Sequence, residues 1–290
     1  MSTSAEVNVD SVGPNGSRLT TMVVTFPRFI LPEFNTHRMF SRNGASSRAI
    51  PVTKQIEQVR TNPFVPNHFN KNAKGMQGGE PVDEELQRIA TVTWLKAAVR
   101  AAEQAEQLQA MGIAKQYANR LLEPFLYTTM VVTGVASAYS NFFALRCHKD
   151  AQPEMQELAK AMYDAYQAST PQLLPAGEWH LPFITESDRR LVVTDRCELD
   201  LDSTTSLLVK SVARCARVSY LNHDKSTPTL TEDYNLYNKL LDSRPGHFSP
   251  FEHQAQALVL NQSDLFAGNL PGWRQYRKTL KNEYTKYFTT

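Results

Sequence analysis

The sequence predicts an α+β fold, and three observations favour it. Residues 19–31 (LTTMVVTFPRFIL) are rich in β-branched and aromatic residues, which indicates a strand. Long stretches further along the chain place apolar residues at helical spacing. Hydrophobic residues make up 41% of the 290 residues, which is enough for a sizeable core.

The N-terminal part is predicted to hold the strand and a long loop. Residues 1–18 are polar and contain Gly, Ser and Asn, so we expect a flexible arm ahead of a single domain over residues 19–290. The strand over 19–31 comes next. Residues 60–80 are rich in Pro, Gly and Asn and predict a long loop, which is either a lid over a functional site or a mobile insertion.

Helices are predicted over most of the middle of the chain. Residues 82–112 begin with acidic residues and end at Gly112, which suits the helix dipole and a C-terminal stop. Residues 114–146 are apolar, so we expect a buried helical stretch that kinks or breaks at Pro124. Residues 153–169 place one face inward, made of Met155, Leu158, Met162 and Tyr166.

The C-terminal part is predicted to mix short strands and helices. Residues 171–203 break the helical pattern and suggest an irregular loop that leads into a short strand. Residues 203–220 and 229–244 each predict a helix, the second with a cap at Thr229 or Thr231. Residues 253–260 predict a strand.

Charge and cysteine usage exclude some classes of protein. A net charge of +2 argues against a nucleic-acid-binding coat but leaves room for a local basic pocket. The three cysteines, Cys147, Cys197 and Cys215, have no paired spacing, so we expect reduced thiols and no zinc site. Neither a secretory signal nor an apolar run of roughly 20 residues is visible. We therefore expect a soluble, cytoplasmic protein without a membrane partner.

Residues 36–48 (THRMFSRNGASSR) concentrate groups that bind anions. Arg38, Arg42 and Arg48 offer planar forks that match phosphate oxygens, and the serine hydroxyls with the backbone N–H groups near Gly44 can surround an anion. A single glycine with no following lysine excludes a P-loop or a dinucleotide-binding turn. The segment is either an anion site or a solvated basic turn.

A second polar cluster is NFFALRCHKDAQ, residues 141–152. Arg146 follows a hydrophobic stretch and should be partly buried, where a guanidinium needs a partner. That partner is either an anionic ligand or an internal carboxylate. Arg120, in ANRLLEP, is in a similar position.

A third cluster is GHFSPFEH, residues 246–253. Its histidines and glutamate fit neither the HExxH pattern nor a zinc finger, so no metal is assigned. Glu252 and His253 are equally consistent with structural hydrogen bonds.

Together these segments resemble the flavin-dependent thymidylate synthase family. THRMFSRNGASSR resembles that family's RHRxxSxNExSxRY motif, SNFFALRCHKDAQPE its NFLxLRxxxxAQxE segment, and ANRLLEPFLYT its ARxxLPxxLYT segment. VARCARVSY and GHFSPFEH resemble AARVSF and GHxTPFEH, which come first in the family but last here. The resemblance therefore implies the family's α+β fold, with a mixed or antiparallel sheet and long helices, in circularly permuted order.

The resemblance also implies an activity. The family methylates dUMP reductively to dTMP, with FAD as cofactor and methylenetetrahydrofolate and NADPH as co-substrates. It needs no cysteine nucleophile, and Cys147 is then a small packed thiol. The family is a homotetramer with active sites between subunits, so we expect the stretch 114–146 at such an interface.

Residue roles follow position by position from the resemblance. Arg146 corresponds to the catalytic arginine that contacts the pyrimidine ring. The substrate-binding positions are Ser46, Ser47, Arg48, Arg120 and Arg146. The cofactor-binding positions are His37, Arg38, Asn43, Asn141, His247 and Ser249. Ser219 matches a family serine whose role is less defined.

Departures from the family motif leave the exact reaction open. Thr36 stands where the motif has arginine, Gly44 where it has glutamate, and Ala49 where it has tyrosine. The alternatives are a flavin- and folate-dependent pyrimidine C5-hydroxymethylase, a related base-modifying enzyme, or a non-catalytic nucleotide-binding protein. A DNA-binding module fits less well, because the net charge is low and no groove-reading helix is evident.

Overall fold

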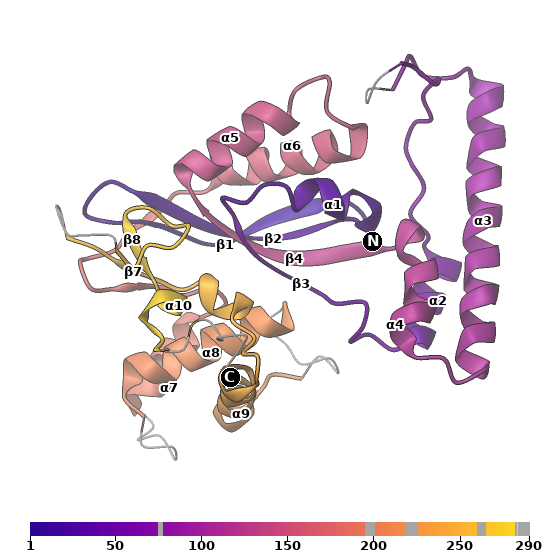
Figure 1. Ribbon diagram of the computed structural model, residues 1–290. Helices are drawn as coiled ribbons and strands as arrows, with labels where there is room; N and C mark the ends of the chain where they lie inside the picture. The colour runs from indigo at the N-terminus through magenta and orange to yellow at the C-terminus, as the bar shows by residue number, and fades with distance from the viewer. Residues whose placement is uncertain (75–77, 195–200, 219–225, 260–264, 282, 284–290) are drawn as a thin grey trace, which may run out of the picture.

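A central mixed sheet organises the molecule. The computed structural model describes residues 1–74, 78–194, 201–218, 226–259, 265–281 and 283 (Figure 1). Within them, five strands form a sheet in the order β3-β4-β2-β1-β5. The pairs β1–β2, β2–β4 and β3–β4 are antiparallel, and β5 runs parallel to β1. The strands are β1 (Ser4–Val12), β2 (Arg18–Pro27), β3 (Ser41–Gly44), β4 (Tyr127–Val135) and β5 (Gln172–Leu173). The predicted α+β class, with a mixed sheet and long helices, is confirmed.

The first strand, β1, corrects the prediction of a flexible arm over residues 1–18. It pairs along its length with β2, and its end pairs with β5. Val7 and Val9 alternate with the exposed Glu6 and Asn8, which is the period of a strand that is buried on one face. The polar composition concealed this alternation.

The strand β4 corrects the prediction of a helical stretch over 114–146. Its residues, YTTMVVTGV, are mostly β-branched and pair with β2 on one side and β3 on the other. A buried central strand has apolar residues on both faces, so its composition resembles that of a buried helix. Burial was predicted correctly for β4, but residues at both ends of the stretch, such as Tyr117 and Leu145, are exposed. Helices flank the strand, with the short α4 (Lys115–Ala118) before it and α5 (Ala136–Arg146) after it.

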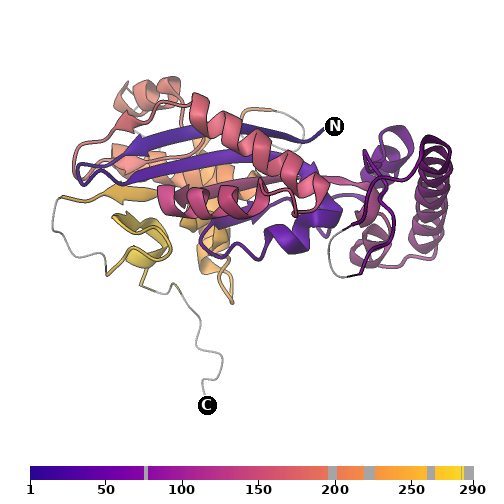
Figure 2. The same ribbon diagram turned by 90° about the horizontal axis from the view of Figure 1, so that it is seen from above.

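Two helices cover one face of the sheet, as Figures 1 and 2 show: α5 and α6 (Pro153–Ala168). The predicted inward face of α6 is confirmed, since Met155, Leu158 and Met162 are buried against the sheet. The short α1 (Leu31–Phe34) contributes Phe34 to the same core.

A helical lobe stands beside the sheet. It contains α2 (Val52–Thr61), α3 (Glu84–Ala110) and α4 (Lys115–Ala118). The predicted helix over 82–112 is confirmed as α3, which begins at the N-cap Asp83. One face of α3 packs Ala98, Ala102 and Ala105 into the lobe. Five apolar side chains on α3 are instead 37–52% exposed, namely Leu86, Ile89, Val92, Leu95 and Val99.

The C-terminal part lies against the other face of the sheet (Figure 1). A second sheet has the order β6-β7-β8 in the described part of the chain. The elements are β6 (Trp179–His180), α7 (Glu186–Thr194), α8 (Ser203–Arg217), α9 (Leu230–Asp242), a 3₁₀ turn (Ser249–Glu252), β7 (Ala255–Ala257), β8 (Trp273–Gln275) and α10 (Tyr276–Thr279).

Most C-terminal predictions agree with these elements. The helix over 203–220 is confirmed as α8, although residues 219 and 220 lie outside the described residues. The helix over 229–244 is confirmed as α9, with a capping box at Thr229. The expected loop over 171–203 holds β5, β6 and α7, and its residues 195–200 lie outside the description.

A buried chain of hydroxyl and imidazole groups joins this C-terminal part to the sheet. His180 Nε2 lies 2.8 Å from Thr21 Oγ1, which lies 2.7 Å from Thr133 Oγ1, and Thr133 Oγ1 lies 2.8 Å from His253 Nδ1. At the other end, His180 Nδ1 lies 2.9 Å from Ser11 Oγ. Burial lowers the pKa of both histidines to about 3, so the chain is uncharged at neutral pH.

A buried ion cluster holds the C-terminal helices to one another. Arg214, which is 1% exposed, donates to both carboxylate oxygens of Asp188 at 2.6 and 2.9 Å. Arg217 pairs with the buried Asp233. Removing one member would leave an uncompensated buried charge, so VARCARVSY has a structural role. Among the helices in the described ranges, none is both long enough and apolar enough to span a bilayer.

Candidate functional site

The segment 36–48 follows one edge of the central sheet. β3 pairs with β4 from Ser41 opposite Thr133 to Gly44 opposite Met130. His37, Phe40, Ser41 and Ser47 are buried, whereas Arg38 and Arg48 are exposed. The buried positions anchor the segment to the sheet and leave these guanidinium groups at the surface.

The first group of site residues joins this segment to the end of α5. Arg146 Nε donates to His37 Nε2 at 2.7 Å, and Arg146 Nη2 donates to Thr36 Oγ1 at 3.3 Å. The His37 ring also meets Phe142 edge-on, with 4.8 Å between ring centroids. Within the described residues, Arg146 has no carboxylate partner. The half-buried position expected for Arg146 is confirmed, but its partner is a histidine, which the sequence reading did not anticipate.

The charge state of His37 follows from this contact. Guanidinium nitrogens can only donate, so His37 Nε2 must accept and the ring carries its proton on Nδ1. Burial, with Arg146 and Arg42 nearby, lowers the pKa of His37 to about 4. The ring is therefore neutral at pH 7, and it orients the Arg146 guanidinium without cancelling its charge.

The second group brings three of the five family-like segments together at Asn43. Asn43 Nδ2 donates to the backbone carbonyl of Cys215 at 2.7 Å, and Ser249 Oγ donates to Asn43 Oδ1 at 3.0 Å. These partners are 172 and 206 residues away in sequence. The segments VARCARVSY and GHFSPFEH therefore contact the arginine-rich segment directly.

The third group surrounds Glu123. Ser47 Oγ donates to Glu123 Oε1 at 2.8 Å, and Arg28 Nε lies 3.1 Å from the same oxygen. Arg120 pairs with Glu123 at 3.4 Å, but its side chain is 62% exposed. The expectation that Arg120 is partly buried is therefore wrong, because the 3₁₀ turn that carries it lies at the surface. Its partner is the internal carboxylate of Glu123.

The structure adds two residues that sequence reasoning missed, Glu123 and Asn119. Asn119 is fully buried, and its amide donates to the backbone carbonyl groups of Ser47 and Ile50. Both residues hold the end of the arginine-rich segment in place. Their presence within ANRLLEPFLYT was a usable signal, since a buried serine and two arginines in one region need an acceptor.

The remaining predicted positions are exposed. Ser46 Oγ accepts from the backbone N–H of Arg48 at 3.3 Å in an exposed turn. Asn141 lies on the solvent-exposed face of α5, and the exposed His247 precedes the turn that carries Ser249. In the described part of the chain, neither Arg38 nor Arg48 forms an ion pair with a carboxylate. Their charges remain available to an anion.

The structure also decides the predictions made for Cys147 and for the pair Glu252 and His253. Cys147 is exposed, so the expectation of a packed thiol is wrong. Glu252 pairs with Arg277 and His253 belongs to the buried hydroxyl–imidazole chain, which confirms the structural alternative for both. Cys197 and Ser219 lie outside the described residues.

Gly44 shows how the departure from the family motif is accommodated. A Cβ atom at this position would lie 3.0 Å from Met130 Cγ and 3.3 Å from Met130 Cε. A glutamate here would require the methionine side chain to move. Gly44 and Met130 are therefore matched to each other across the β3–β4 pair.

Comparison with known proteins identifies the family. A family model described as "Thymidylate synthase complementing protein" matches residues 17–172, which is more than half of the sequence. The chain belongs to this family, and the resemblance found from the motifs is confirmed. The segments 213–220 and 246–253 lie outside the matched range, so the circular permutation stays a prediction.

Curated relatives carry the name flavin-dependent thymidylate synthase. The protein from Aquifex aeolicus is 30% identical over 145 residues, which cover 49% of this chain and 43% of the relative. The protein from Kosmotoga olearia is 27% identical over 152 residues, covering 51% and 62%. The protein from Thermosipho africanus is 26% identical over 153 residues, covering 52% and 64%. The chain thus spans less than two thirds of the length of each of these relatives.

Similar solved structures include two crystal structures of the UMP/dUMP methylase PolB from Streptomyces cacaoi. One, bound with 5-Br UMP, is 19% identical with a TM-score of 0.48 and covers 57% of this chain and 89% of that chain. The other, bound with 5-Br dUMP, is 23% identical with a TM-score of 0.43 and covers 51% and 66%.

Proposed function

We propose that this protein is an FAD-dependent enzyme that converts dUMP to dTMP by reductive methylation. Methylenetetrahydrofolate would supply the carbon and NADPH the electrons. The relatives named above motivate the proposal. The observation that carries it is Arg146, a half-buried guanidinium oriented by a neutral histidine, with no neutralising carboxylate in the described part of the chain.

Arg146 is suited to stabilising negative charge on a pyrimidine ring. Carbon 5 of uracil becomes nucleophilic when negative charge builds on the ring, at O2 and N3. A guanidinium already held in position stabilises that charge without reorganising during the reaction. His37 and Thr36 use two of the Arg146 nitrogens, and Nη1 has no protein partner among the described residues. The proposed role is electrostatic and requires no proton transfer to or from Arg146.

The exposed turn at Ser46 and Arg48 is suited to the nucleotide phosphate. Arg48 offers a fork of donors and Ser46 a hydroxyl, both at the surface. Ser47 would act indirectly, since its hydroxyl already donates to Glu123. Arg120 could contact the same phosphate from the neighbouring turn, because its bond to Glu123 is long and exposed.

The residues present fit an anionic cofactor such as FAD. Arg38, Asn141 and His247 have polar side chains at the surface, and these side chains form no hydrogen bond to other described residues. Asn43 and Ser249 already bond to each other and would support these neighbours. His37 is occupied by Arg146 through Nε2, which leaves only its Nδ1–H for a cofactor. The chemistry that bound FAD supplies is hydride transfer.

We also propose a homotetramer with sites between subunits. Within the stretch 114–146 that was expected at an interface, β4 lies inside the sheet, whereas Tyr117, Leu121 and Leu145 are exposed. The apolar stripe of α3 is the better candidate, because exposed apolar side chains in a row favour burial against another chain.

A second candidate reaction is supported by Gly44. The family motif has a glutamate there, and Met130 occupies the space beside the glycine. This change favours an altered one-carbon chemistry, such as C5-hydroxymethylation. Product analysis by mass spectrometry distinguishes the two, since a methyl product is lighter than a hydroxymethyl product by one oxygen atom.

The decisive test is the Arg146→Ala variant. We expect turnover to fall on the order of a hundredfold or more, equivalent to about 3 kcal/mol of barrier. Arg60→Ala is the control, since Arg60 is an exposed residue of the helical lobe paired with Glu106. Unchanged turnover in Arg146→Ala would contradict the assigned role. A purified protein that stays colourless after FAD is added would favour a non-catalytic nucleotide-binding protein.

A further inference from the structure

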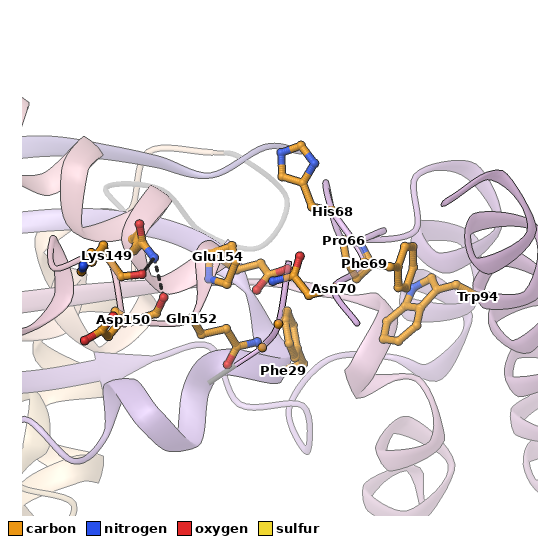
Figure 3. A pocket seen from close by; sticks show the side chains of 15 residues that line it. Phe29, Pro66, His68, Phe69, Asn70, Trp94, Lys149, Asp150, Gln152 and Glu154 are labelled. Atoms are coloured by element: carbon orange, nitrogen blue, oxygen red, sulfur yellow. Dashed lines mark hydrogen bonds between the residues drawn. The ribbon is translucent and has the colours of Figure 1, made fainter. Parts of the chain in front are cut away.

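A cavity of about 510 Å³ lies between the helical lobe and the start of α6. The loop after α2, the turn between α5 and α6, and Trp94 of α3 line it (Figure 3). None of the site residues assigned above is among its lining residues. Its size is within the range of small-molecule sites.

Hydrogen bonds from three directions hold the loop that forms one wall. Phe64 N–H donates to the Phe125 carbonyl at 2.8 Å, and Phe69 N–H donates to Gln87 Oε1 at 3.1 Å. Asn67 Nδ2 donates to Glu157 Oε2 of α6 at 3.2 Å. The described part of the 60–80 loop is therefore tied to its surroundings, which disfavours the reading of a mobile insertion there.

Aromatic side chains form much of the lining. Phe29, Phe69 and Trp94 all border the cavity. Trp94 Nε1 already donates to the Phe64 carbonyl at 2.7 Å, so the indole offers ring surface and no free donor. Such walls favour a flat ring, because stacked aromatic pairs gain interaction free energy beyond that of simple burial.

Glu154 is the notable polar group of this cavity. It is only 5% exposed, yet in the described part of the chain it has neither an ion-pair partner nor a side-chain hydrogen bond. It stands in the first turn of α6, where the helix dipole favours a negative charge. A carboxylate accepts only, and its two oxygens can take two parallel N–H donors.

The geometry points to a binding site for a flat heterocycle that carries two adjacent N–H donors on one edge. The chemical class is the 2-aminopyrimidin-4-one ring, which guanine and pterins share. Glu154 would accept from the ring N–H and the 2-amino group, and the aromatic walls would stack on the ring. Asn70 and Gln152, which also line the cavity, offer amides to the remaining ring atoms (Figure 3).

The test is calorimetric titration of the full-length protein with guanosine and with inosine. Neither nucleoside carries a phosphate, which separates this measurement from the proposed nucleotide site. Inosine lacks only the 2-amino group, so we expect it to bind at least about tenfold more weakly. Glu154→Gln should weaken guanosine binding by a similar factor and remove most of the preference for guanosine. Asp164→Asn, an exposed residue of the same helix, should change neither.

Further titrations distinguish a pterin from a guanine compound and test a cation as the rival ligand. Tighter binding of pterin than of guanosine, with the same Glu154 dependence, assigns a pterin, and the reverse assigns a guanine compound. Equal binding of inosine and guanosine to the wild type overturns the proposal without relying on any variant. Tight binding of tetramethylammonium that displaces guanosine also overturns it, since the cavity is then a cation site. Loss of turnover in Arg146→Ala bears only on the proposed function.

Discussion

At the scale of single residues, the contact between Arg146 and His37 carries the most chemical information. The histidine is a positioning residue, because it accepts from Arg146 Nε and fixes the orientation of the guanidinium. We expect His37→Phe to lower kcat about tenfold, since a hydrogen bond to a charged group is lost. His37→Gln retains an acceptor and should keep more of the activity. Steady-state kinetics measure both, and equal kcat in His37→Phe and the wild type would contradict this role.

Asn43 is the second residue whose effect can be stated in advance. It links β3 to the carbonyl of Cys215 in α8 and to Ser249. Asn43→Ala leaves the Cys215 carbonyl without this donor, so we expect a loss of about 1–2 kcal/mol in the free energy of unfolding. Urea denaturation measures it. Asn72→Ala, at an exposed site without a side-chain hydrogen bond to other described residues, is the control, and an equal loss in both variants would count against the link.

At the scale of elements, α3 presents an unusual surface. Its small alanines pack inward, and a row of larger apolar side chains points outward. If this row is an interface between copies, Val99→Asp should dissociate the assembly, because an unpaired charge would be buried there. Light scattering reads out the mass. Gln104→Asp, at an exposed position of the same helix, should leave the mass unchanged. A wild-type monomer would contradict both the tetramer and this interface.

Elements also show where sequence reading succeeds. The helices α3, α6, α8 and α9 were predicted because their caps and apolar spacing are local signals. The strands β1 and β4 were not. β1 was concealed by polar residues on its exposed face, and β4 by apolar residues on both faces. Strand identity depends on partners that are distant in sequence, which a local pattern does not contain.

At the scale of the whole molecule, the buried histidines make stability depend on pH. His180 and His253 have a folded-state pKa of about 3, below the ordinary value of 6.5. Their stabilisation is therefore present above pH 6.5 and is lost as pH falls toward 3, because only the unfolded chain takes up these protons. We expect the free energy of unfolding to drop by roughly 3 kcal/mol between pH 6.5 and 5 for the two together.

Urea denaturation at several pH values tests this dependence. The window from pH 6.5 to 5 lies above the range in which most carboxylates titrate, so histidines dominate the change. A free energy of unfolding that stays flat across the window would show that the two imidazoles are not buried as described.

Local sequence patterns were enough to predict the family, the α+β class, most of the helices and the candidate site positions. These depend on motifs and on spacing over a few residues, which are readable without partners. The packing of the whole chain was needed to show that residues 4–12 and 127–135 are strands, that Arg146 contacts His37, and that Glu123 and Asn119 support the site. The cause is that hydrogen-bond partners distant in sequence depend on which segments the fold brings into contact. Asn43 and Ser249, 206 residues apart, meet only because the sheet and the C-terminal part pack together.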